Sequence, residues 1–211
     1  MPMKCELCAG EIPQDDSQCP ACAASQNYEQ IYKILSQALN FLSEKIHQEI
    51  DKPKLLFLIG NLYRLRGEID RAISYYETAV KEGGAQPDYY RSLGTALCIK
   101  SDFKAAVEIM RKSVDLCPQY PDYRNDLGAA YFKAGQYDKA IEEFKEAIRL
   151  NPNYANAHNN LAFAYRKKSA YEQAEREITE AIRLDPKHAV ANYELGRSYY
   201  HGGMFSQSRS V

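Results

Sequence analysis

Two pairs of cysteines stand close together near the start of the chain. Residues 5 to 22 read CELCAGEIPQDDSQCPAC, and Cys5, Cys8, Cys19 and Cys22 are spaced C-x2-C-x10-C-x2-C. Each C-x2-C pair can form a tight turn that offers two thiolates, and two such turns can surround one metal ion tetrahedrally. In a reducing compartment, cysteines clustered in this way are better explained as metal ligands than as disulfides. The motif therefore predicts a metal site.

The four thiolates favour zinc, and their spacing resembles that of a short zinc ribbon. Iron in a rubredoxin-like site has the same ligand set, so iron is the alternative metal. The glycine that usually follows each pair is displaced or missing, since Ala9-Gly10 and Ala23-Ala24 stand there. A catalytic zinc keeps a position open for water and usually has a histidine ligand. Four thiolates leave no open position and no histidine lies in the first 46 residues, so we expect a structural site.

The sequence around the cysteines is a poor surface for nucleic acid. Residues 1–24 contain one lysine, Lys4, against four acidic residues. Phosphate binding depends on clustered Lys and Arg. Nucleic-acid binding through the ribbon is therefore an unfavoured alternative, and a protein-binding surface is the better expectation for this segment.

The sequence contains no recognisable catalytic motif. The four histidines are scattered and match no H-E-x-x-H pattern, and the phosphate-binding motifs G-x-x-x-x-G-K-[ST] and G-x-G-x-x-G are absent. Cys98, Cys117 and His158 fall in predicted helices, where packing is their expected role. We therefore expect no enzymatic activity.

The composition is that of a protein dissolved in the cytoplasm. The chain has 211 residues, 45% of them hydrophobic and 26% charged, with a net charge of −1. No apolar stretch approaches the roughly 18 residues needed to span a bilayer. The first residues, MPMKC, contain no apolar segment of a secretory signal. We expect a cytoplasmic protein with no membrane association.

A repeat of 34 residues organises most of the chain. The segment YRNDLGAAYFKAGQYDKAIEEFKEAIRLNP at 123–152 is followed by AHNNLAFAYRKKSAYEQAEREITEAIRLDP at 157–186. Leu127-Gly128, Tyr131 and the later Ala140-x3-Phe144 resemble the pattern of the tetratricopeptide repeat, a helix–turn–helix unit with that period. Arg124 stands where that pattern has tryptophan.

The resemblance implies an all-α fold, a right-handed superhelical solenoid of helix–turn–helix repeats. We expect four full repeats and a partial fifth, at 53–86, 87–120, 121–154, 155–188 and 189–211. They follow a four-cysteine motif at 1–24 and a linker with a capping helix at 25–52. Small residues such as Gly94 and Gly128 should let the two helices of a unit approach, while large ones such as Phe144 fill the space between neighbouring units. Gly67 and Gly135 suit the turn between helices.

The two ends of the repeat array differ in character. Residues 28–50 place Tyr28, Leu35, Leu39 and Leu42 on one face, which predicts an amphipathic helix covering the first repeat. Terminal repeats normally carry a polar capping surface, and none is apparent after Tyr199. We expect that end to continue into further chain, to contact a partner, or to support a homo-oligomer.

In this family the first helix of each unit lines a concave groove that binds peptides. The groove positions that the resemblance assigns are polar, cationic or aromatic: Asn61, Arg64, Arg91, Asn125, Lys133, Asn159, Phe163, Arg166, Lys167 and Arg197. Cations outnumber acids at these positions, which would steer an acidic partner.

The sequence therefore predicts an adaptor or scaffold for protein–protein interaction. It would bind a peptide, acidic in this interpretation, in the groove of the repeats. Two other functions remain open at this stage: nucleic-acid association through the zinc ribbon, and self-assembly through the last repeat.

Overall fold

The described part of the chain is almost entirely helical. The computed structural model describes residues 3–4, 11–12, 20–45 and 51–186, with side chains from residue 33 onward. Its helices are α1 (Pro20–Lys45), α2 (Lys52–Leu65), α3 (Ile69–Gly83), α4 (Pro87–Ile99), α5 (Phe103–Leu116), α6 (Pro121–Lys133), α7 (Tyr137–Leu150), α8 (Ala155–Lys167) and α9 (Tyr171–Leu184). Two short strands, β1 (Met3–Lys4) and β2 (Glu11–Ile12), form an antiparallel pair.

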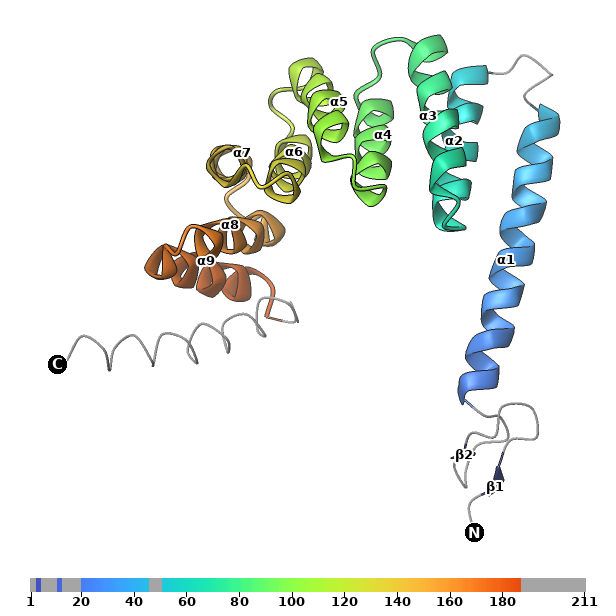
Figure 1. Ribbon diagram of the computed structural model, residues 1–211, viewed down its shortest axis with the longest axis horizontal. Helices are drawn as coiled ribbons and strands as arrows, with labels where there is room; N and C mark the ends of the chain where they lie inside the picture. Colours follow the sequence, from blue (N-terminus) through green and yellow to red (C-terminus); the bar gives the residue numbers. More distant parts are fainter. Residues whose placement is uncertain (1–2, 5–10, 13–19, 46–50, 187–211) are drawn as a thin grey trace.

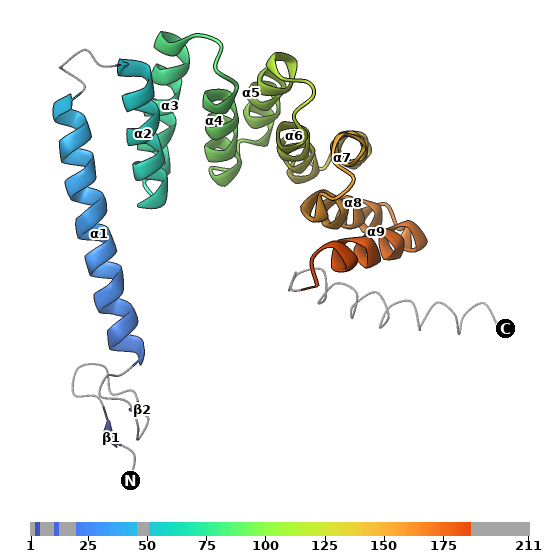
Figure 2. The ribbon, with the colours of Figure 1, turned by 180° about the vertical axis from the view of Figure 1, so that it is seen from behind.

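Helices α2 to α9 form four helix pairs that follow one another along a curved array (Figure 1). The expected all-α array of helix–turn–helix repeats is therefore confirmed, and each pair falls on one segment predicted as a repeat. The bend places α6 on the inner side and α7 on the outer side, as both views show (Figure 2). The predicted fifth repeat at 189–211 lies outside the described residues.

Within each unit, a small residue on the first helix faces a large residue on the second. An added Cβ at Gly128 would lie 2.6 Å from the Phe144 ring, and one at Gly60 would lie 2.7 Å from the Tyr76 ring. Gly94 faces Met110 in the same way. The fourth unit packs Ala162 with Ile178 instead. The predicted role of the small residues is confirmed, because the absent Cβ leaves room for the large side chain. Phe144, which was predicted to fill the space between neighbouring units, packs against Gly128 of its own unit.

The turn between the two helices of a unit requires a left-handed backbone at one residue. Gly67 and Gly135 have φ values of 78° and 74°, as their predicted place in the turn requires. Ser101 and Ser169 occupy the same position in the second and fourth units, with φ values of 68° and 59°. Serine adopts this conformation less readily than glycine, which has no Cβ.

In the described array the buried side chains form three clusters, and the partly buried Leu97 and Tyr165 each pack against two of them. The largest cluster of buried side chains runs from Cys98 on α4 to Ala164 on α8 and includes Met110, Leu127 and Phe144. Helix contacts are made within a unit or to a neighbouring unit. The array is therefore stabilised by successive local interfaces, as in other repeat proteins.

Helix α1 packs against α2 at the end of the array. It begins at Pro20, earlier than the helix predicted from residue 28, because proline suits the first turn of a helix and alanines follow it. Leu39 is buried, as the predicted apolar face requires. Ile34 and Phe41 lie off that face and are exposed.

The predicted metal ligands cannot be placed. Cys5, Cys8 and Cys19 lie outside the described residues, and Cys22 falls in α1 where only the backbone is described. Within the described part of the chain, no His, Cys, Asp and Glu side chains gather into a group that could hold a metal ion.

Candidate peptide-binding surface

Nine of the ten predicted groove residues lie on the first helices of the units. These residues are Asn61 and Arg64 on α2, Arg91 on α4, Asn125 and Lys133 on α6, and Asn159, Phe163, Arg166 and Lys167 on α8. Helices α2, α4, α6 and α8 contact one another in that order, so these residues share one side of the array. The tenth residue, Arg197, lies outside the described residues.

Several of these polar side chains bind other parts of the protein. The Asn61 amide oxygen accepts a hydrogen bond of 2.7 Å from the Tyr76 hydroxyl. The Asn125 amide oxygen accepts one of 2.9 Å from the Asn160 amide on the next first helix. Asn159 is 6% exposed, and within the described residues its amide oxygen has no hydrogen-bond partner. The Asn61 bond therefore joins the two helices of the first unit, and the Asn125 bond joins the third unit to the fourth.

Arg91 forms an ion pair inside the array. Its Nε lies 2.5 Å from the Asp126 carboxylate on α6, and its guanidinium lies 5.9 Å from the Tyr123 ring centre. Burial opposes the charge of Arg91, but Asp126, together with the more weakly acting Asp122 and Asp88, raises its pKa.

The two other carboxylates beside Arg91 accept hydrogen bonds from tyrosines. The Tyr123 hydroxyl donates to Asp88 over 2.9 Å, and the Tyr154 hydroxyl donates to Asp122 over 2.6 Å. Burial and these carboxylate acceptors raise the pKa of both tyrosines. One arginine thus stands among three carboxylates, and the surface at α4 and α6 is acidic at this point.

Two of the predicted groove cations lie at the ends of α6 and α8. Lys133 and Lys167 are the last residues of these helices and are exposed. Within the described chain neither forms an ion pair. By contrast, Lys100 and Lys168, each one residue beyond a helix end, pair with Asp70 over 2.5 Å and Asp138 over 3.0 Å.

Arg166 and Phe163 on α8 form a second cationic feature. The Arg166 guanidinium lies 5.7 Å from the centre of the Phe163 ring, and both side chains are partly buried. A cation over an aromatic face is stabilised by the ring's quadrupole. Lys167 follows Arg166 directly at the end of α8.

Two exposed apolar residues occupy the same helix position as the two lysines. Leu65 ends α2 and is 61% exposed, and Ile99 ends α4 and is 49% exposed. We call the four helix-end residues Leu65, Ile99, Lys133 and Lys167 the end row. Counting forward by 34 residues from Leu65 would have identified it, but Leu65 and Ile99 were not among the predicted site residues.

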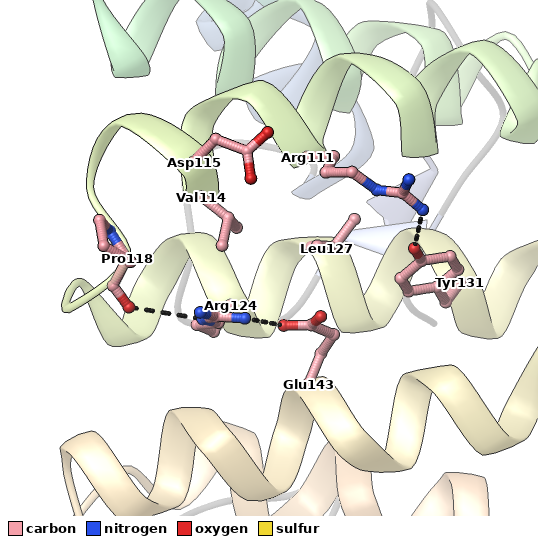
Figure 3. Close-up of a pocket in the computed structure, with 8 residues that line it drawn as sticks. All are labelled: Arg111, Val114, Asp115, Pro118, Arg124, Leu127, Tyr131 and Glu143. Carbon is pink, nitrogen blue, oxygen red and sulfur yellow. Dashed lines mark hydrogen bonds and ion pairs between the residues drawn. The ribbon is translucent and has the colours of Figure 1, made fainter.

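A separate cavity of about 470 Å³ lies between α5, α6 and α7. Figure 3 shows three bonds in its lining: from Arg111 to the Tyr131 hydroxyl over 2.6 Å, and from Arg124 to Glu143 over 2.9 Å and to the Pro118 carbonyl over 3.4 Å. The Arg111–Tyr131 bond joins the second unit to the third, and the Arg124–Glu143 bond joins α6 to α7 within the third unit. The cavity adds no candidate ligand contact.

Repeated helix pairs that expose charged and apolar side chains along their first helices define a scaffold for binding proteins or peptides. The chain is a member of the tetratricopeptide repeat family. Four tetratricopeptide repeat models match residues 57–121, 109–142, 130–169 and 155–188, which together span 57–188.

Solved structures of this family are similar in fold. YrrB, described as a TPR protein with an unusual peptide-binding site, is 24% identical with a TM-score of 0.66, over 80% of this chain and 87% of its own. MamA from Desulfovibrio magneticus RS-1 is 21% identical with a TM-score of 0.68, over 82% and 99%. A chain of the APC/C hetero-tetramer Cut9-Hcn1 is 24% identical with a TM-score of 0.67, over 81% and 34%. Such identities show the fold alone.

No curated protein matches this chain in sequence. Of the helices in the described residues, none combines the length and the apolar character needed to cross a membrane.

Proposed function

We propose that the protein is an adaptor that binds an acidic peptide segment along its first helices, with the carboxylates of the peptide at α6 and α8. The observation that carries this proposal is the contrast between two kinds of lysine at the helix ends. Lys100 and Lys168 are used in ion pairs between units. Lys133 and Lys167 are exposed at the adjacent position without such a pair among the described residues.

The acidic preference belongs to the third and fourth units. Arg91, although predicted to contribute, stands among Asp88, Asp122 and Asp126, so its charge is balanced within the protein. A peptide carboxylate would be repelled there and attracted to Lys133 and Lys167. The peptide-binding site named for YrrB supports a peptide as the ligand class.

Peptide binding by the full chain tests this proposal. Fluorescence anisotropy with labelled Glu-rich, Lys-rich and neutral peptides should give tightest binding to the Glu-rich peptide, weakening as salt rises. The double variant Lys133→Glu/Lys167→Glu should reduce that affinity by about tenfold, since exposed charges each contribute up to about 1 kcal/mol. Lys104→Glu, an exposed lysine on α5, is the matched control and should leave binding unchanged. Equal binding of all three peptides would contradict the proposal.

We also propose that Cys5, Cys8, Cys19 and Cys22 hold one structural zinc ion. Two features of the backbone support this: β1 and β2 bracket the segment with Cys5 and Cys8, and α1 begins between Cys19 and Cys22. Four thiolates match the donor set of closed zinc sites. Metal analysis of the purified full chain should give one zinc per chain, and a Cys5→Ser/Cys8→Ser variant should lose it. Iron with visible thiolate absorption would replace zinc as the metal, and no bound metal would refute the site.

A further inference from the structure

The end row changes character along the array. Its first two members, Leu65 and Ile99, are apolar and about half exposed or more. Its last two members, Lys133 and Lys167, are cations that make no ion pair in the described chain. All four are final helical residues of consecutive first helices and are spaced 34 residues apart. The row therefore presents two apolar positions followed by two positive ones.

Exposed apolar side chains at such regular places are notable because the same helix position is charged in the other units. Leu58, seven residues before Leu65 on α2, is also 38% exposed. Large apolar side chains that gather on a surface mark interaction sites more often than isolated ones do. Because Lys133 and Lys167 follow in the row, a ligand that covers Leu65 and Ile99 must also be compatible with two positive charges.

The spacing of the row suits one peptide conformation. First helices of neighbouring units pack directly on each other, and packed helices lie about 8–10 Å apart. A polyproline II chain has three residues per turn and rises about 3.1 Å per residue, so every third side chain returns to one face after about 9 Å. One turn of such a peptide therefore corresponds to one repeat.

We infer that the end row binds a peptide in the polyproline II conformation with two apolar residues and two acidic residues, each three positions apart. The apolar pair contacts Leu65 and Ile99, and the acidic pair contacts Lys133 and Lys167. This inference rests on the proposed function, to which it adds the apolar half, the spacing and the conformation of the ligand. The end row changes from apolar to cationic along the array, so a peptide that changes from apolar to acidic along its length complements it.

The test uses the full chain and synthetic peptides that carry Leu-x-x-Leu-x-x-Glu-x-x-Glu, with Pro and Gln at the x positions, or the same motif in reverse order. We expect at least one order to bind about tenfold more tightly than its version with Ser in place of Leu, because two apolar side chains leave water. A peptide with the same residues at every second position should lose the gain. Equal affinities for both spacings would overturn the inference.

Protein variants separate this inference from the proposed function. Leu65→Ser/Ile99→Ser should abolish the gain from the leucines and leave the affinity for the acidic peptide unchanged. Leu116→Ser, an exposed residue that ends α5, is the control and should keep the gain. If acidic peptides bind and the leucines add nothing, the inference fails and the proposed function stands. If acidic peptides do not bind, the proposed function fails.

Sedimentation distinguishes a peptide from a second copy of the chain as the occupant. The wild-type protein and the Leu65→Ser/Ile99→Ser variant should show the same mass at all concentrations. A wild-type dimer that the variant no longer forms would show that a second copy covers the apolar half, and would overturn the inference.

Discussion

His158 occupies the position at which the family pattern has tryptophan, and its ring makes two polar contacts. Its Nδ1 lies 2.7 Å from the Glu177 carboxylate and its Nε2 lies 3.1 Å from the Pro152 carbonyl. Both partners only accept hydrogen bonds, so both ring nitrogens must donate and the ring is an imidazolium. Arg124 makes the equivalent contacts one repeat earlier. The position is buried, as a packing role requires, but a cation fills it.

This geometry predicts a pH-dependent stability. Burial opposes the charged ring, but the hydrogen bonds to Glu177 and Pro152, with the charges of Glu177 and Glu180, raise the pKa of His158 above 6.5. The added stability is therefore fully present below pH 6.5 and is lost as the pH rises through the folded pKa. Urea unfolding from pH 5 to 9 should show wild type losing on the order of 1 kcal/mol relative to His158→Arg, which stays charged. If the difference in the free energy of unfolding between the two proteins stayed constant from pH 5 to 9, His158 would not be an imidazolium in the folded protein.

The left-handed turn residues predict opposite effects of exchanging serine and glycine. Ser101→Gly should stabilise the protein by up to about 1 kcal/mol, because glycine adopts a positive φ without a Cβ penalty. Gly135→Ser should destabilise it by a similar amount, since an added Cβ meets nothing within 4 Å and only the backbone conformation changes. Urea unfolding measures both. Effects of the same sign in the two variants would contradict this explanation.

At the scale of the element, the contact between the two helices of a unit depends on a small residue facing a large one. The third unit uses Gly128 with Phe144, and the fourth uses Ala162 with Ile178. The added methyl group of alanine is thus accompanied by a smaller partner. Packed interiors accept such changes when the total volume is kept.

A double-mutant cycle tests this compensation. Gly128→Ala alone should cost about 1–3 kcal/mol, because its Cβ would overlap the Phe144 ring. Phe144→Ile alone should cost a similar amount by leaving a cavity. The double variant, which copies the fourth unit, should be more stable than the sum of the two costs predicts, by about 0.5–3 kcal/mol. Additive costs measured by urea unfolding would show that the two residues are not coupled.

At the scale of the whole molecule, the larger contacts among α2 to α9 lie within a unit or between adjacent units. Stability in such an array is close to a sum of unit and interface terms, so a local defect should weaken its neighbours more than the far end.

Hydrogen exchange can follow this locality. Phe144→Ala removes a side chain that is 1% exposed, at a cost of about 3–5 kcal/mol. Amide exchange should accelerate most in α6 to α8 and least in α2 and α3. Leu116→Ser, at an exposed site, serves as the control and should change exchange only near the end of α5. Uniform acceleration along the chain after Phe144→Ala would show that the array unfolds as one unit.

The sequence by itself determined the repeat, its period and its packing positions. A 34-residue recurrence of glycine, alanine and large apolar residues specifies helix pairs whose faces can only be buried against each other. The bounds of α2 to α9 follow from this local pattern. The close approach at Gly128 was predictable because its contact lies within one unit, whereas Phe144 was expected between units and packs against Gly128 of its own unit.

Only the tertiary structure decided which charges are available to a ligand. From position alone, Arg91, Lys133 and Lys167 are equivalent cations of the groove. Packing brings Arg91 beside Asp126, a residue 35 positions later, and leaves the two lysines at helix ends without such a partner in the described chain. The physical reason is that helix periodicity sets the face on which a side chain lies. The electrostatic potential that a ligand meets there depends also on the residues that another unit places next to that side chain.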